Sequence, residues 1–163
     1  MIRNRCLQVW FVVLVVAACR SGGPVQVYTY WGATVERLPA NSSYDWWPSG
    51  TALRASNEPA DEGLERLVRQ TVEAELEAMG FHKRSPDADV DFYVWLHLGR
   101  GFQPSASGPE NRAMLMVDIL DSSDEHRIYR AWADAAVDPT LTPEERKARI
   151  QHAVREVLKP LAP

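Results

Sequence analysis

Two segments of the chain carry apolar residues at the three- and four-residue spacing of an amphipathic helix. In residues 61–79 this stripe consists of Leu64, Leu67, Val68, Val72, Leu76 and Met79. Gly80 follows where a left-handed residue commonly ends a helix, and Phe81 can fold back onto the last turn. The pattern predicts a helix over residues 61–79 that stops at Gly80.

The second helical segment begins with a specific start signal. Thr142 and Glu145 are spaced as a capping box, with Pro143 at the first helical position. The apolar stripe that follows consists of Ile150, Ala153, Val154, Val157 and Leu158. Pro160 ends the pattern, so a closing helix is predicted from Pro143 up to that proline.

Apolar residues at every second position, with β-branched and aromatic side chains, predict strands over residues 25–30, 90–98, 113–120 and 127–137. Residues 44–47 could add a short strand. Residues 121–125 form a polar turn, so the last two long strands should pair as an antiparallel hairpin. Residues 99–112 are dense in Gly, Pro and Ser, which predicts a mobile connection.

Two helices with one apolar stripe each can both be covered by one face of a single sheet. The predicted fold class is therefore α+β, a two-layer sandwich. We expect a mixed or antiparallel sheet of four to five strands with both helices packed on one face. Residues 25–163 would form this single domain, which is long enough to bury a real core.

The first residues have a different character. Arg3 and Arg5 precede an apolar run from residue 7 to residue 18, too short for the roughly 20 residues of a membrane-spanning helix. A basic start, a short apolar stretch and small residues at its end are typical of an export signal, here residues 1–18.

The end of this leader, Val16-Ala17-Ala18-Cys19, resembles the lipobox of bacterial lipoproteins. The resemblance implies cleavage before Cys19 and acylation of that residue, which would begin a lipidated tether over residues 19–24. Three acyl chains suffice for stable anchoring, because one chain alone gives only marginal membrane binding. The alternative is an ordinary secretory signal that leaves Cys19 as a free thiol. Arg20, rather than aspartate, favours the outer membrane, with the domain on the periplasmic side.

Cysteine content and charge fit an exported protein. The other cysteine, Cys6, lies in the leader, so the mature chain has no pair for a disulfide. Loss of residues 1–18 removes Arg3 and Arg5 and no acidic residue, which changes the net charge from -4 to -6. Nucleic acid is therefore not expected as a partner, because its phosphates demand a basic surface.

The order of motifs resembles the bacterial lipoprotein family called domain of unknown function 4136. The resemblance covers residues 64–161 and rests on five segments: LERLVRQTVEAELEAMGF, PDADVDFYVWLHL, AMLMVDILDSS, IYRAWADA and RIQHAVREVLKPL. Family members often carry Trp-Arg-Gly where this chain has Tyr129, Arg130 and Ala131. The resemblance implies a small exported or lipid-anchored module, and the family has no agreed catalytic residues to transfer.

Candidate chemistry is sparse along the chain. Asp87, Asp89 and Asp91 alternate like the start of a calcium loop, but Phe92 and Leu98 replace the glycine and the glutamate that such a loop requires. The histidines also lack metal-ligand spacing; they are His82, His97, His126 and His152. We therefore predict no metal or other cofactor and no catalytic residue. Asp118 and Asp134 are at most a loose carboxylate pair and more simply mark one strand face.

One face of the predicted sheet is rich in residues typical of protein interfaces. These are Tyr93, Trp95, His97, Met114, Met116, Arg130 and Trp132. They form a possible binding surface if the helices cover only the other face. The competing interpretation is that the segment from residue 31 to residue 59 packs over them with Trp46 and Trp47.

The leading hypothesis is a non-catalytic, lipid-anchored envelope protein with a binding or assembly role. It would be held to the membrane, with another envelope protein as the candidate partner. Two alternatives stay open. One is an envelope hydrolase with a site invisible in sequence, which requires a concave pocket and a strongly shifted acid or base. The other is a carrier of a small apolar ligand, which requires an enclosed cavity.

Overall fold

The computed structural model describes residues 25–31, 38–48, 52–54, 62–84, 88–105 and 108–162. The predicted leader, the lipidation site Cys19 and the tether up to residue 24 lie outside these residues. Within the described ranges, no helix is long and apolar enough to cross a membrane.

Both predicted helices are present, with the ends that their local signals indicate. Helix α1 spans Glu62–Ala78, and its end has the hydrogen bonds of a Schellman motif: Gly80 N donates to Glu77 O at 2.9 Å and Phe81 N to Leu76 O at 3.0 Å. Gly80 has a φ of 89°, and the Phe81 side chain is fully buried. The predicted stop is confirmed.

Helix α2 spans Pro143–Leu158 and continues as a short 3-10 turn, η1, over Lys159–Leu161. The predicted capping box is formed in both directions. Glu145 N donates to Thr142 Oγ1 at 3.2 Å, and Thr142 N donates to Glu145 Oε2 at 2.9 Å. These two bonds satisfy backbone groups that the first turn of a helix leaves unpaired.

The strands form one mixed sheet of seven strands. They are β1 (Gln26–Trp31), β2 (Ser43–Trp46), β3 (Ala52–Arg54), β4 (His82–Lys83), β5 (Phe92–Ser105), β6 (Gly108–Asp121) and β7 (Arg127–Ala136). Six follow one another in the order β1-β7-β6-β5-β2-β4, and β3 pairs with β5 beside this path. β2 and β3 run parallel to β5, whereas β5, β6, β7 and β1 pair antiparallel.

Two sequence predictions about the sheet need correction. It has more strands than the predicted four to five, because β3 and β4 are only three and two residues long and carry no pattern of their own. Residues 99–105 and 108–112 are not a loose connection, because β5 and β6 stay paired from Gly99↔Met114 out to Ser105↔Gly108. Cross-strand hydrogen bonds hold this stretch as strand despite its Gly and Pro content.

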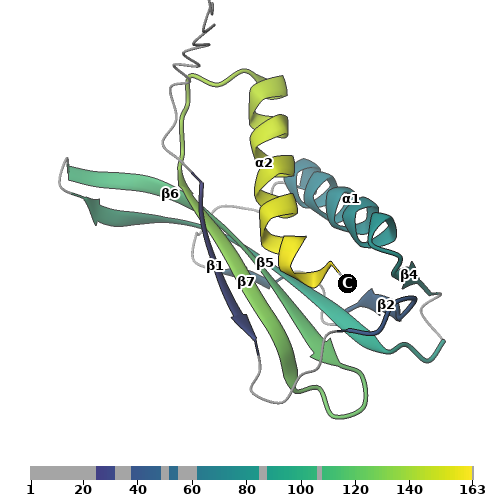
Figure 1. Ribbon diagram of the computed structural model, residues 1–163. Helices are drawn as coiled ribbons and strands as arrows, with labels where there is room; N and C mark the ends of the chain where they lie inside the picture. Colours follow the sequence, from purple (N-terminus) through teal and green to yellow (C-terminus); the bar gives the residue numbers. More distant parts are fainter. Residues whose placement is uncertain are drawn as a thin grey trace, which may run out of the picture.

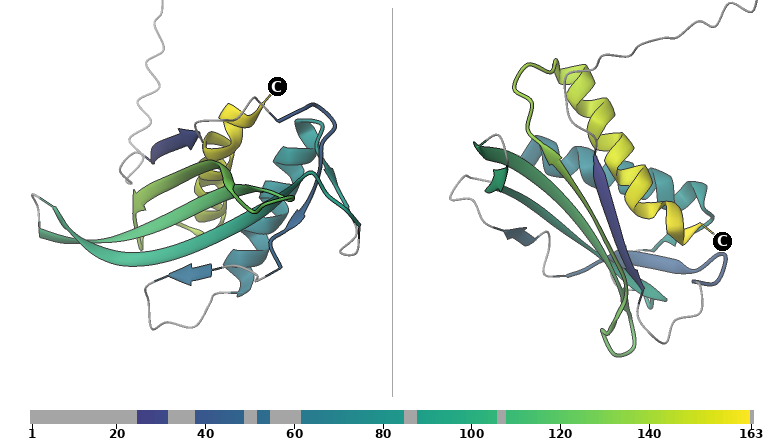
Figure 2. Two further views of the ribbon diagram at one scale, coloured as in Figure 1. Left: turned by 90° about the horizontal axis from the view of Figure 1, so that it is seen from below. Right: turned by 60° about the vertical axis from the view of Figure 1, so that its left-hand side comes forward.

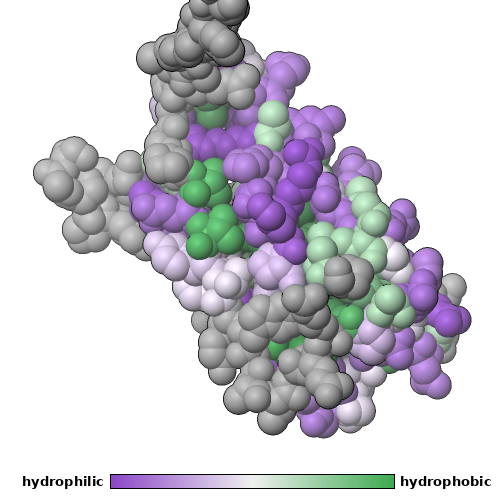
Figure 3. All heavy atoms as spheres, viewed as in Figure 1, coloured by the Kyte–Doolittle hydropathy of each residue, from purple (hydrophilic) through white to green (hydrophobic). Residues whose placement is uncertain are grey.

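The predicted two-layer α+β arrangement is confirmed: both helices pack on one face of the sheet (Figure 1). The core between the layers consists of buried side chains from both, including Val68, Val72 and Leu76 of α1 with Val154, Val157 and Leu158 of α2. The sheet contributes every second residue, such as Val94, Leu96, Val117 and Ala131. Over α2 the outward surface is mostly hydrophilic (Figure 3), as expected for a helix with one apolar stripe.

The paired ends of β5 and β6 extend beyond the helical layer as a two-stranded arm (Figure 1 and the right view of Figure 2). We call residues 100–105 and 108–113 the arm. Because the arm extends beyond the ends of the helices, the sheet is longer than the helical layer that covers it. The opposite sheet face, which we call the outer face, is the one that the two helices do not cover (Figure 2).

Candidate functional site

The seven residues predicted as a binding surface come from three neighbouring strands, and they alternate with the core residues of those strands. Alternation places them on the outer face, because successive side chains of a strand point to opposite sides. Pairing of β1 with β7 brings Tyr28 beside them, opposite Trp132. Sequence reasoning missed Tyr28, because the order of strands in the sheet is not visible in the local pattern.

The register lines up a row of four large side chains across four strands. His97 of β5 lies opposite Met116 of β6, Met116 opposite Trp132 of β7, and Trp132 opposite Tyr28 of β1. The rings of Tyr28 and Trp132 stack with centroids 5.2 Å apart and an interplanar angle of 19°. Tyr28 is 45% exposed, and it is the one exposed large hydrophobic residue among those whose side chains the structure describes. We call these four residues the aromatic row.

A charged cluster lies beside this row. Asp118 has no exposed surface, and its carboxylate accepts two hydrogen bonds from Arg130, from Nε to Oδ1 and from Nη2 to Oδ2, both at 2.6 Å. His97 Nε2 lies 3.1 Å from Oδ2, and Arg127 Nε lies 3.4 Å from Oδ1. Two parallel bonds from one guanidinium are a strong and geometrically specific pairing.

This environment keeps Asp118 ionised. Burial raises the pKa of the carboxyl, but the hydrogen bonds from Arg130 and His97 and the charges of Arg130 and Arg127 outweigh it, so the pKa lies below its ordinary value. The same contact raises the pKa of Arg130. Since an ionised carboxylate only accepts, Nε2 of His97 must carry the hydrogen that it donates to Asp118.

Two polar atoms beside this cluster are buried without a hydrogen-bond partner: Nδ1 of His97 and Nε1 of Trp95. The two rings lie against each other, with centroids 4.3 Å apart. A histidine oriented by an aspartate supplies two of the three members of a hydrolase triad. Here Nδ1 of His97 has no hydrogen-bond partner among the described residues, and Asp118 also accepts a hydrogen bond from Arg130. Asp118 therefore orients the imidazole ring of His97.

The two tryptophans that could cover the outer face lie on opposite sides of the sheet. Trp47 packs on the outer face, with its ring 5.4 Å from Tyr93 and 6.1 Å from Trp95. Trp46 packs against the helical layer: its Nε1 donates to Glu73 Oε1 at 2.7 Å, and Arg69 lies 4.4 Å above its ring. Among the described residues, Trp47 therefore covers the β5 end of the face, while Tyr28 stays exposed at the β1 end.

Asp118 and Asp134 do not form a carboxylate pair. Asp134 accepts a hydrogen bond from Arg112 at 2.8 Å, whereas Asp118 is held by Arg130. In the register, Asp118 of β6 lies opposite Arg130 of β7. Asp134 lies four residues further along β7, a distance of about 13 Å along the strand. Each carboxylate has an arginine of its own.

The remaining candidates have structural surroundings. Asp91 accepts hydrogen bonds from the backbone N and the Oγ of Ser43, at 2.6 and 2.8 Å, which lower its pKa and fasten the start of β5 to β2. Asp89 is exposed, and Asp87 lies outside the described residues. His82 on β4 and His152 on α2 are exposed, far apart in sequence and on different elements.

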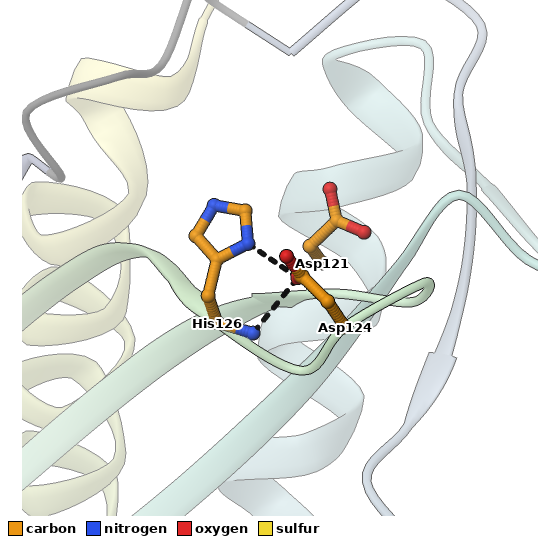
Figure 4. A group of neighbouring side chains, drawn as sticks. All are labelled: Asp121, Asp124 and His126. Atoms are coloured by element: carbon orange, nitrogen blue, oxygen red, sulfur yellow. Dashed lines mark hydrogen bonds and ion pairs between the residues drawn. The ribbon is translucent and has the colours of Figure 1, made fainter.

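The turn between β6 and β7 brings together Asp121, Asp124 and His126, whose potential ligand atoms all lie within 4.8 Å of one another (Figure 4). The sequence prediction named no metal site and missed this cluster. Its groups are already engaged, since His126 Nδ1 bonds to Asp124 Oδ1 and Asp121 accepts from Ser123 N at 2.7 Å. The hydrogen bond to Asp124 raises the pKa of His126. These contacts are those of a polar turn that closes a hairpin.

Comparison with known proteins adds a family and a fold. The family model described as domain of unknown function (DUF4136) matches residues 27–160. A DUF4136 family protein from Bacteroides thetaiotaomicron superposes with a TM-score of 0.58 at 11% identity, covering 85% of this chain and 97% of that one. The PelC dodecamer from Paraburkholderia phytofirmans gives a TM-score of 0.56 at 11% identity, covering 85% and 98%. A comparison with curated proteins found no match.

Proposed function

Because this chain belongs to the DUF4136 family, we propose that it is a non-catalytic, lipid-anchored envelope protein that binds a protein partner through the outer face of its sheet. The lipid anchor would be at Cys19, and the domain would stand on the periplasmic side of the outer membrane. The observation that carries the proposal is the aromatic row, which ends in the exposed ring of Tyr28.

The composition of the outer face supports binding rather than catalysis. Trp, Tyr, Met and Arg are enriched at the centres of protein interfaces. Trp132 and Met116 are only half-buried, and Tyr28 continues the row to the edge of the sheet. The charged cluster around Asp118 fixes the positions of Arg130 and His97 on this face, so a partner would meet a preorganised surface.

The leader supports the location. Its small residues before Cys19 fit a lipobox. PelC from P. phytofirmans, which has the same fold, is a dodecamer. That assembly supports a role for this fold in building larger complexes.

The test is photocrosslinking in living cells that export the full chain. A photoreactive phenylalanine at position 28 samples the exposed end of the aromatic row, and the same residue at position 152 samples the exposed side of α2 as a control. We expect adducts from position 28 and none of comparable yield from position 152. The double variant Trp95→Ala, Trp132→Ala should reduce the adducts from position 28, provided that thermal melting shows a folded protein.

Equal adduct yields from positions 28 and 152 would contradict the proposal, because contact would then not be specific to the outer face. Adducts at position 28 that persist unchanged in a folded double-alanine variant would remove the aromatic row from the binding surface. A hydrolase or a ligand carrier predicts no dependence of protein adducts on Trp132.

A further inference from the structure

The two ends of the sheet are protected very differently. At one end, β4 is only two residues long, and both of them, His82 and Lys83, are exposed polar residues. A very short strand with a lysine is a common way to prevent another chain from pairing with a sheet edge. The β4 edge is therefore poorly suited to pair with a further strand.

The other end lacks these devices. β1 has six residues, QVYTYW, without a charge or a proline, and its register with β7 runs from Gln26↔Asp134 to Trp31↔Tyr129 without a bulge. β7 is the one described strand that pairs with β1, so the second edge of β1 has no backbone partner among the residues that the structure describes. Long, uncharged, regular edge strands of high β-propensity are those that recruit a further strand.

The arm is a poorer docking edge. Pro104 lies opposite Pro109 in its register, and a proline has no N–H to donate to an added strand. The arm also includes Gly101 and Gly108, which weaken strand pairing because glycine loses more conformational entropy than other residues. Of these three edges, β1 is the one suited to accept a partner.

We propose that β1 is a self-association edge at which a second copy of this chain pairs its own β1 in antiparallel orientation about a two-fold axis. This inference rests on the proposed binding role of the sheet, and it names the partner. An isologous contact needs a self-complementary segment. β1 meets that requirement because it has no charge to repel its copy.

The pairing also accounts for the exposed ring at the edge. Tyr28 stacks on Trp132 and is 45% exposed beside the free edge. Antiparallel pairing centred on β1 places the aromatic rows of the two copies side by side on one continuous outer face, since alternation is preserved across a ladder. The centre of the strand falls at Tyr28 and Thr29, both exposed, so the two-fold axis passes beside one of these residues.

The experiment uses disulfide formation between copies of the full chain in the oxidising cell envelope. Cysteine is placed by Tyr28→Cys or Thr29→Cys, and by Lys83→Cys on the β4 edge as the matched control. At a two-fold axis a residue meets its own copy, with Cα atoms about 4.5–5.5 Å apart, within the range of a disulfide. We expect about tenfold or more disulfide-linked dimer from position 28 or 29 than from position 83, because pairing gives the thiols a high effective concentration.

The outcomes separate this inference from the proposed anchor. A disulfide dimer of the unsubstituted chain would show that Cys19 keeps a free thiol, which contradicts the lipid anchor. The comparison of positions 28, 29 and 83 in a Cys19→Ser background then still decides the edge. Equal dimer yields at β1 and β4, or disulfides from β1 to a foreign protein alone, would overturn the self-association edge.

A second measurement does not depend on thiols. Thr29→Lys puts two positive charges against each other at the proposed axis, whereas Thr29→Val keeps a β-branched residue that suits a strand. In the detergent-solubilised full chain, light scattering should show a dimer for the natural sequence and for Thr29→Val, and a monomer for Thr29→Lys. A natural sequence that is monomeric, or a Thr29→Lys variant that stays dimeric with an unchanged melting temperature, would refute the pairing.

Discussion

Asp118 is the residue on which the outer face depends most. Its carboxylate has no exposed surface and is shared by Arg130, His97 and Arg127. A buried charge is tolerated only when its partners replace the water that it lost, and removal of one partner of such a pair is far more costly than removal of an exposed one. The sharpest residue-scale test therefore compares it with the more exposed Asp134.

We expect Asp118→Ala to lower the free energy of unfolding by about 3 kcal/mol, because Arg130 and His97 lose their common acceptor. Asp134→Ala removes the partner of Arg112. The side chains of this ion pair are 17% and 18% exposed, so the free energy of unfolding should fall by about 1 kcal/mol or less. Urea unfolding of both variants measures the difference. Equal losses would show that the Asp118 cluster contributes no more than an ordinary ion pair.

The dependence on pH gives the same prediction a second readout. The pKa of Asp118 in the folded protein lies below its ordinary value, so its stabilisation is complete above the unfolded pKa of about 3.9. It is lost as the pH falls through the lowered folded pKa. The stability gap between the natural sequence and Asp118→Asn should therefore be constant from neutral pH to about pH 5 and shrink below about pH 4.

The sequence pattern predicts which face a residue lies on but not its cross-strand partner. Alternation correctly puts Trp95, Met116 and Trp132 on one face, and it puts Asp118 and Arg130 there too. It says nothing of which residue lies opposite which, because register depends on the turn and the bulge between Ile119 and Leu120. The pairing Asp118↔Arg130, and with it the burial of a charge, had no local signal.

The end of α1 and the start of α2 are determined by residues close to them in sequence. Their limits follow from Gly80, Phe81 and the Thr142–Glu145 capping box, whose hydrogen bonds all form within a few residues. The strands behave differently. The arm and the two-residue β4 exist because a partner strand satisfies their backbone, which composition alone cannot indicate.

Gly80 permits a direct test of the end of α1. It has a φ of 89°, and a Cβ built there meets nothing within 4 Å. Gly80→Ala should therefore destabilise the fold by about 1–2 kcal/mol through backbone strain alone. Gly80→Asn should cost less, because asparagine tolerates the left-handed region. A midpoint of urea unfolding that is unchanged by Gly80→Ala would contradict this account of the helix end.

At the scale of the whole molecule, the fold is a sheet covered on one side. The helices bury the core face, and the outer face has only the partial cover of Trp47 that the described residues show. One-sided sheets normally have a polar second face. The outer face of this sheet carries the aromatic row instead. The proposed binding role therefore belongs to this face.

The proposed lipid anchor at Cys19 can be tested by substitution of that cysteine. Cys19→Ser should abolish incorporation of a fatty-acid analogue into the exported protein and leave the leader attached, since the acylated cysteine directs the cut. Cys6→Ser, within the leader, is the matched control and should keep the label. Gel migration and mass spectrometry of the N-terminal peptide measure both. Label retained in Cys19→Ser would place the lipid elsewhere.

The pairing of β1 with β7 has a consequence for how the chain acquires its structure. Tyr28 is paired with Trp132, so a loop of about a hundred residues must close before this contact can form. The segment that is synthesised first is thus completed late, after the β5–β6 and β6–β7 hairpins, which close over short distances. Until then an uncharged, aromatic stretch stays unpaired next to the predicted leader. Such an exposed stretch can associate with other nascent chains before the domain has folded.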